Sequence, residues 1–326
     1  MCTPPHALGL RPDAAASLLA SADTTEQVIE QVLATAEARA KLLRFFVAWL
    51  EIDDVDQFDI APSAFPEFTP ELAEALLQET HSFLEHQLGS VAPSLKDVTQ
   101  STSPFVSDAL SAIYQGVRAS GNEPVELDPE RRLGIFTQPA FIASHSGPET
   151  TRLIKRGVFF TRKVMCLPLG EPPTNIDTSL PEIAGATERE RIESATEAPV
   201  CAACHSVINP FGFMLENYDP LGRWRDEDAS GFLIDASIGV DFLDEGPLYA
   251  TSPVEALRGF TDSWAFQQCF TRQLFRFYLG RPEVSSDDPV LRELFFDFAN
   301  GERQDLVDML STLAGSSTFA RRAETP

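Results

Sequence analysis

The sequence contains no run of 18 apolar residues, and its first residues lack a basic segment followed by an apolar stretch. The first absence excludes a membrane-spanning helix, and the second excludes an ordinary secretory signal at this start. Basic residues are scarce, because 25 Lys and Arg stand against 49 Asp and Glu, a formal net charge of −24. A field of this sign repels nucleic acid and anionic membranes, so we expect neither as a partner.

Cysteine is also scarce, with five residues in 326. No second Cys-x-x-Cys pair is present, which argues against a structural zinc site. Cys166 and Cys269 either pair in an oxidising compartment or remain buried free thiols, and the sequence leaves both alternatives open. Cys2 is either the remnant of a lipid-modified N-terminus or a stray cysteine.

Against these absences stands one motif, Cys201-Ala202-Ala203-Cys204-His205. Cys-x-x-Cys-His is the attachment pattern of c-type haem, in which both thiols form thioethers and the histidine binds the iron. On a helix, Cys201 and Cys204 share one edge and His205 follows on the next position. A thioredoxin-like dithiol would need a strand–helix–strand setting, which does not surround this motif. The motif therefore predicts covalent haem c, with His205 as the proximal ligand.

The rest of the chain predicts a mostly α, multi-helical fold with a cytochrome c-like haem segment inserted between helical subdomains. Hydrophobic residues make up 43% of the chain, enough for a large core. Apolar spacings of three and four predict one long helix from a Thr24 cap through Val32, Ala36 and Ala40 to Leu50. Further helices are expected at 70–88, 151–165, 187–197, 252–260, 263–279 and 305–313, with turns at Gly121-Asn122, Gly147-Pro148, Asn209-Pro210 and 219–222.

Breaks in these patterns divide the chain into four parts. We expect an N-terminal helical domain at 1–120, and a connecting segment with a Pro-rich linker at 121–180, where Pro172 and Pro173 stand. The haem c-binding segment follows at 181–247, and a C-terminal helical domain at 248–326.

The residues after the motif suggest walls for a porphyrin. Pro210-Phe211-Gly212-Phe213 is predicted to form a turn that presents Phe211 and Phe213 to the haem face. Arg223 and Arg225 are candidate partners for the haem propionates. The alternative for these arginines is ion pairing with Glu216, Asp219 or Asp226, and both readings remain open.

The distal side of the iron decides between an electron carrier, which has a second protein ligand, and an open site for oxygen chemistry. His145, in a short loop sequence, is the possible distal ligand, although a loop histidine is more often solvated. A core position is the expected role of Met214, and a surface position that of His81 and His86. The remaining candidates are Met165, Met309 and His6.

An ordered series of segments resembles the planctomycete-type cytochrome c proteins that are built from serial domains of unknown function. The resemblance runs from about residue 25 to the C-terminus. Its segments are 45–50, 65–72, 134–141, 155–157, 166–168, 201–205, 209–213, 216–219, 222–225, 279–281 and 319–322.

The resemblance implies a secreted protein with one haem, whose relatives usually carry further N-terminal domains. We therefore expect a periplasmic or extracellular location, and a chain that is a truncated or mature form. Relatives often have a histidine shortly before the first haem cysteine, where this chain has Ala195.

Three functions compete. The leading hypothesis is an extracytoplasmic c-type cytochrome that transfers electrons to a redox partner protein. The second is a haem enzyme with an open distal site for peroxide or oxygen chemistry. The third is a helical interaction module without haem, in which Cys201 and Cys204 form a disulfide or bind zinc.

Overall fold

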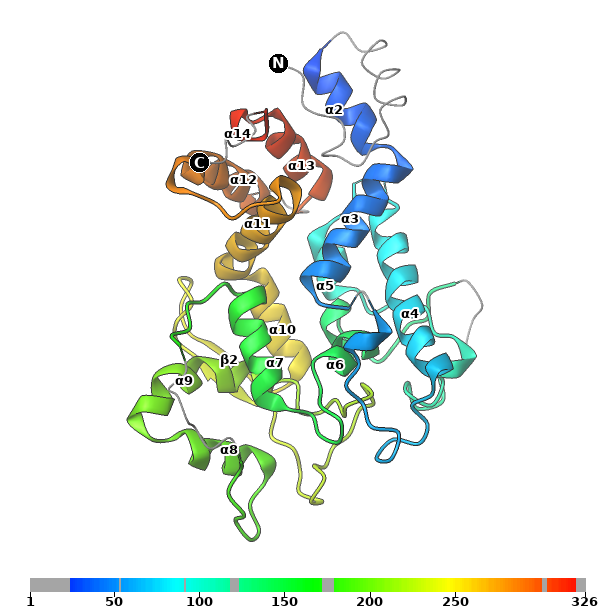
Figure 1. Cartoon of the computed structure of the whole chain (residues 1–326), viewed down its shortest axis with the longest axis vertical. Coiled ribbons are helices and arrows are strands. Elements are labelled where there is room, and N and C mark those ends of the chain that lie inside the picture. Colours follow the sequence, from blue (N-terminus) through cyan, green and yellow to red (C-terminus); the bar gives the residue numbers. More distant parts are fainter. Residues whose placement is uncertain are drawn as a thin grey trace.

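The computed structural model describes residues 24–52, 54–90, 92–117, 123–171, 179–300 and 304–320, and these form a mostly α protein, as predicted (Figure 1). Within them, the only sheet is a small antiparallel pair, β1 (Ile238–Val240) and β2 (Leu248–Ala250), with Ile238 opposite Ala250. Cys2, His6, the Gly121-Asn122 turn and the Pro172-Pro173 linker lie outside the described residues. The α-helices are α2 (Thr25–Leu33), α3 (Ala36–Trp49), α4 (Pro70–Leu88), α5 (Leu95–Gln100), α6 (Pro139–Ser144), α7 (Leu153–Phe159), α8 (Glu188–Thr196), α9 (Pro199–Phe213), α10 (Pro253–Asp262), α11 (Trp264–Leu279), α12 (Asp288–Asn300), α13 (Leu306–Gly315) and α14 (Ser317–Ala320).

The first predicted helix is two helices, so the prediction of one long helix was wrong. Thr24 does form the expected capping box with Gln27 at the start of α2. Thr35 then caps a new helix, since its side chain accepts a hydrogen bond from the Ala38 backbone N–H. The restart changes which side chains face inward, so Ala36 and Ala40 are exposed. The buried face of α3 consists of Ala38, Leu42, Phe45, Phe46, Val47 and Trp49.

Helix α4 matches its prediction. Thr69 is the N-cap, Pro70 occupies the first turn, and the helix ends before Gly89. Near the C-terminus, α10, α11 and α13 form close to their predicted positions, whereas α12 and the small sheet were not predicted. None of the described helices combines the length and apolar composition that crossing a bilayer requires.

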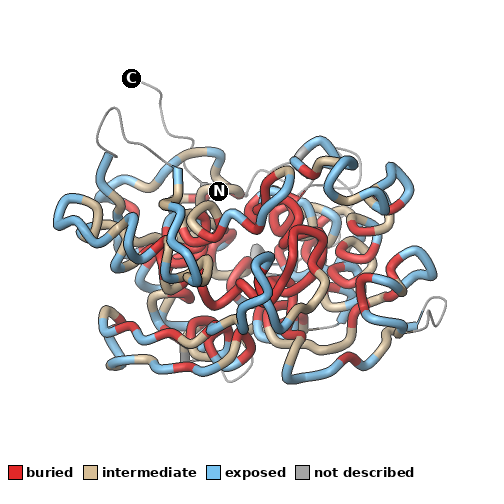
Figure 2. The backbone as a smooth tube through the Cα atoms, turned by 90° about the horizontal axis from the view of Figure 1, so that it is seen from below, coloured by how far each residue is buried: buried red, intermediate tan, exposed pale blue. Residues whose placement is uncertain are grey.

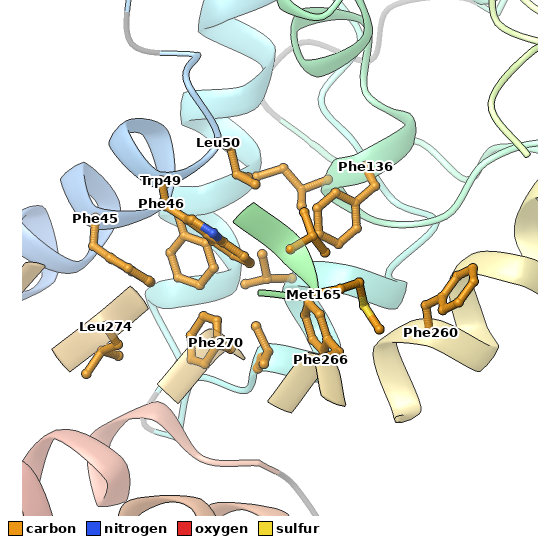
Figure 3. Packing of buried hydrophobic residues seen from close by; sticks show 14 of the residues in the cluster. Phe45, Phe46, Trp49, Leu50, Phe136, Met165, Phe260, Phe266, Phe270 and Leu274 are labelled. Atoms are coloured by element: carbon orange, nitrogen blue, oxygen red, sulfur yellow. The ribbon is translucent and has the colours of Figure 1, made fainter. Parts of the chain in front are cut away.

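Aromatic side chains from distant parts of the sequence form the centre of the core (Figure 3). Trp49 of α3 packs edge-on against Phe136 and Phe270, and its indole N–H donates to the Lys163 carbonyl oxygen at 2.8 Å. Helix α2 packs against α13, so the two ends of the described chain share this core. Figure 2 shows the buried residues gathered at the centre of the molecule, with exposed loops around them.

Cys166 and Cys269 form a disulfide, with their Cα atoms 5.2 Å apart. This bond links the segment after α7 to α11 and closes a loop that contains α8, α9 and the sheet. The disulfide resolves the choice that the sequence left open for this cysteine pair.

Helix α7 continues into a π-helical turn, Phe160–Val164, with Met165 as its C-cap. This helical segment therefore ends where the predicted 151–165 helix does.

Candidate functional site

Helix α9 carries the Cys-x-x-Cys-His motif in its first two turns. Pro199 occupies its first turn, where a missing N–H costs nothing. Cys201 and Cys204 are free, partly exposed thiols. Because the α-helix repeats every 3.6 residues, Cys201 shares a face with both Cys204 and His205. The local geometry that the motif predicts is therefore present.

The second half of α9 is packed tightly onto α7 (Figure 1). Two glycines permit the close approach. A Cβ added at Gly157 would lie 2.3 Å from the Ile208 carbonyl oxygen, and one at Gly212 would lie 2.4 Å from the Leu153 carbonyl oxygen. Only glycine fits at such contacts, so these two residues fix the position of the helix that carries the motif.

The prediction of a turn at Asn209-Pro210 was wrong, because both residues lie inside α9. A proline inside a helix costs about 3 kcal/mol. Burial of the neighbouring side chains of Ile208, Phe211 and Phe213 offsets this cost. The local preference of Asn and Pro favours a turn at this point, but packing of the neighbouring side chains in the core stabilises the helix. The turn predicted at 219–222 is present, with Gly222 at a φ of 81°.

A buried arginine holds the chain just after α9. Arg156 of α7 is 1% exposed, and its guanidinium donates to the carbonyl oxygens of Leu215 and Tyr218, both at 2.8 Å. It also donates to the Ser146 hydroxyl at 2.7 Å. Burial lowers the pKa of Arg156 to about 9, so the side chain remains a cation at neutral pH. It fixes the end of α9 from the core side.

His205 is held by a side chain of its own helix. Its Nδ1 lies 2.9 Å from the Asn209 Oδ1, one turn further along α9. The Asn209 amide in turn donates to the Thr196 hydroxyl at 3.0 Å. Thr196 is the last residue of α8, so a hydrogen-bonded connection joins the charged helix to the motif. Sequence reasoning missed both Thr196 and Asn209.

A cavity of about 280 Å³ lies on the Asn209 side of His205. Arg189 of α8 lies over the Phe213 ring at 4.7 Å and forms a salt bridge with Glu193. The volume is just below that of typical ligand sites, and neither motif cysteine lines it. Its lining residues are Arg189, Glu193, Thr196, Ala202, His205, Ser206, Asn209, Pro210, Phe213, Ile238 and Gly239.

The structure brings one of the two predicted aromatic residues to His205. Phe213 lines the cavity, whereas Phe211 is fully buried and packs against Phe160 and Phe260 at centroid distances of 5.9 and 4.7 Å. A helix of charged residues was predicted at 187–197 and forms as α8, and the structure shows a capping box at its start. The sequence indicated only that Arg189 lies on this helix, and gave no signal that it would line the cavity beside His205.

Arg223 and Arg225 lie away from this cavity. The Arg223 guanidinium binds the carboxylates of Asp219, at 2.6 Å, and Glu67. Arg225 donates to the backbone oxygen of Glu216 at 3.3 Å. Arg223 therefore has the carboxylate pairing that was the alternative to propionate binding. The propionate role of both arginines stays a prediction.

His145 is buried in the core and is not a loop residue in solvent. It follows α6, is 3% exposed, and its ring packs on Phe159 with centroids 3.9 Å apart. Its Nε2 lies 3.0 Å from the Leu50 carbonyl oxygen. Burial lowers the pKa of His145 to about 3, so the ring is neutral. It does not line the cavity beside His205.

The other distal candidates are also elsewhere. Met165, Met214 and Met309 are buried in the core, as expected for Met214. His86 is exposed on α4 with its ring against Phe105, and His81 is partly exposed on the same helix. Among the residues that the structure describes, no three His, Cys, Asp or Glu side chains are grouped as a metal site requires.

Two family models match the chain. Residues 3–115 match PSD4, described as a protein of unknown function (DUF1592), and residues 132–228 match PSCyt3, described as a protein of unknown function (DUF1588). No curated protein and no solved structure matches significantly. The second match contains the Cys201–His205 motif. The chain thus carries two domains of the planctomycete cytochrome c-associated kind, one in its first third and one around the motif.

Proposed function

We propose that Cys201 and Cys204 attach one haem c covalently and that His205 binds its iron from the proximal side. The observation that carries this proposal is the state of the three side chains. Both thiols are free and partly exposed, and the hydrogen bond to Asn209 occupies Nδ1 of His205. The nitrogen left for a metal is Nε2, which is a usual histidine donor.

The surface beside the thiols supports an apolar cofactor. Val200 is 65% exposed, and it lies one helical turn before Cys204, on the same face. A large apolar side chain in water gains from being covered, at about 25 cal/mol per Å² of buried apolar surface. A porphyrin attached to Cys204 would cover it. Because both thiols are themselves partly exposed, we expect one haem edge to be exposed.

When bound, haem supplies a one-electron redox centre. The chain provides the covalent attachment, the proximal ligand and its hydrogen-bonded support. An exposed edge suits exchange of electrons with another protein, and the net charge of −24 favours a basic redox partner. Export to an oxidising compartment agrees with the Cys166–Cys269 disulfide.

Absorption spectroscopy and intact mass test the proposal. Expression with a haem-attachment system should add the mass of one haem and give the α-band of haem c after reduction. The double variant Cys201→Ser with Cys204→Ser should lose both. Ser206→Ala, a change on the same helix, serves as the control. A wild-type chain of unmodified mass would exclude covalent haem and favour the interaction module with a Cys201–Cys204 disulfide or zinc.

A second candidate, a haem enzyme with an open distal site, is favoured by one observation. Among the residues that the structure describes, the histidine and methionine candidates for the distal ligand lie in the core or on α4. A high-spin iron that binds carbon monoxide readily would support this function. A low-spin, six-coordinate spectrum in both oxidation states would support the electron carrier.

A further inference from the structure

We infer that Asn209 and Thr196 are positioning residues, which hold His205 in its Nδ1–H tautomer and thereby set the donor strength of Nε2. This inference rests on the proposed haem function for its redox consequence. The tautomer itself is a property of the chain without any cofactor. Three hydrogen bonds in sequence carry the argument.

The sequence begins at α8. The Thr196 hydroxyl has one hydrogen, and it donates to the Ile192 carbonyl oxygen at 2.8 Å. A hydroxyl that donates there offers its lone pairs to other groups. It can therefore accept from the Asn209 Nδ2, 3.0 Å away. With its NH₂ group directed at Thr196, Asn209 presents its carbonyl oxygen, Oδ1, to His205.

An amide oxygen only accepts hydrogen bonds. The His205 Nδ1, 2.9 Å from Oδ1, must therefore carry the proton and donate. In a neutral imidazole the other nitrogen, Nε2, then holds the free lone pair. This is the form that binds a metal through Nε2.

The reversed arrangement satisfies fewer groups. If the Asn209 amide were rotated, its NH₂ would donate to an unprotonated Nδ1, and its oxygen would face Thr196. The Thr196 hydroxyl would then have to donate to that oxygen and would lose its bond to Ile192. One hydrogen bond fewer corresponds to roughly a tenfold preference for the first arrangement.

The same contact sets how strongly His205 can donate to iron. A hydrogen bond from the second ring nitrogen to an acceptor raises the basicity of the metal-bound nitrogen. A more basic ligand stabilises the oxidised iron, so the reduction potential falls. A stronger acceptor at position 209 should lower the potential, and an apolar residue there should raise it.

The first test uses the haem-free full chain. Long-range ¹⁵N–¹H spectra at a pH where the ring is neutral distinguish the two tautomers, and His205→Gln identifies the signal. Wild-type protein should show the Nδ1–H form. Asn209→Leu and Thr196→Val, each close in shape to the original residue, should reduce its excess several-fold. Ser194→Ala, an exposed position on α8 outside the cavity lining, should leave it unchanged, and circular dichroism checks that each variant folds.

A wild-type ring in the Nε2–H form, or an Asn209→Leu spectrum identical to wild type, would overturn the inference. Both outcomes are independent of haem attachment, so failure here is distinct from failure of the proposed function. The second test measures reduction potentials of the haem-loaded variants. The potential should be lowest for Asn209→Asp, intermediate for wild type and highest for Asn209→Leu. Equal potentials in the three proteins would overturn the redox consequence.

Discussion

The first half of α9 carries Cys201, Cys204 and His205, all partly exposed, whereas the second half presents Ile208, Phe211 and Phe213 to the core. The first half contributes reactive groups and buries little apolar surface. The second half contributes packing, through glycine contacts with α7, and carries no group of evident reactivity. One helix thus carries the reactive groups in its first half and most of the anchoring contacts in its second, where Asn209 is the residue that also supports His205.

The largest effect is expected from an added methyl group in the second half of α9, which packs on α7. Gly212→Ala places a Cβ 2.4 Å from the Leu153 backbone oxygen, and overpacking of this kind costs about 3 kcal/mol. Urea unfolding of the haem-free chain measures the loss. Gly170→Ala, where no atom lies within 4 Å of an added Cβ, is the matched control. Equal stability of the two variants would show that α7 and α9 are not tightly coupled.

A smaller effect on stability is expected from pH, through Glu216, which lies just after the end of α9. Burial raises the pKa of Glu216 to about 7 from 4.5, and the nearby Glu188 carboxylate adds to the shift. The folded state therefore favours the protonated acid. Its contribution to stability is full below pH 4.5 and is lost as the pH rises through 7. Unfolding free energies measured from pH 5 to 8 should fall, and Glu216→Gln should flatten that slope.

Glu197→Gln removes one exposed carboxylate near the end of α8 and controls for the change in net charge. If Glu216→Gln leaves the pH slope as steep as in the wild type, the buried acid is not its source.

The smallest effect is expected in the first half of α9, which carries the two motif cysteines. Cys201→Ser with Cys204→Ser alters two partly exposed side chains that are free thiols. Such surface substitutions change stability by about 0.5 kcal/mol or less. Thermal unfolding of the haem-free protein should therefore match wild type. A loss comparable with that of Gly212→Ala would mean that this half also supports the fold.

Much of the fold was predictable where local signals agree with packing. Thr69, Pro70 and Gly89 defined α4, and the charged stretch 187–197 indicated α8. The motif itself gave the positions of Cys201, Cys204 and His205. Predictions failed where tertiary contacts overrode local preference, as at Pro210 inside α9, or where a cap restarted a helix, as at Thr35.

The support of the site was not predictable for a different reason. Asn209 beside proline has the sequence signature of a turn, and Thr196 resembles any residue at the end of a helix. Their roles depend on α8 and α9 meeting at one point, which the sequence does not encode locally. His145 was misjudged for the same reason, because its burial comes from Phe159 and Leu50, distant in sequence.

The Cys166–Cys269 bond also bears on how the chain matures. Its partners are 103 residues apart, whereas Cys201 lies much nearer to Cys166 along the chain, and short loops close at lower entropic cost. Cys166, Cys201, Cys204 and Cys269 allow three complete pairings among themselves, and chain entropy alone does not favour the native one. The proposed thioethers on Cys201 and Cys204 would leave a single pairing among these four. Attachment of the cofactor before disulfide formation would then prevent the wrong disulfides among them.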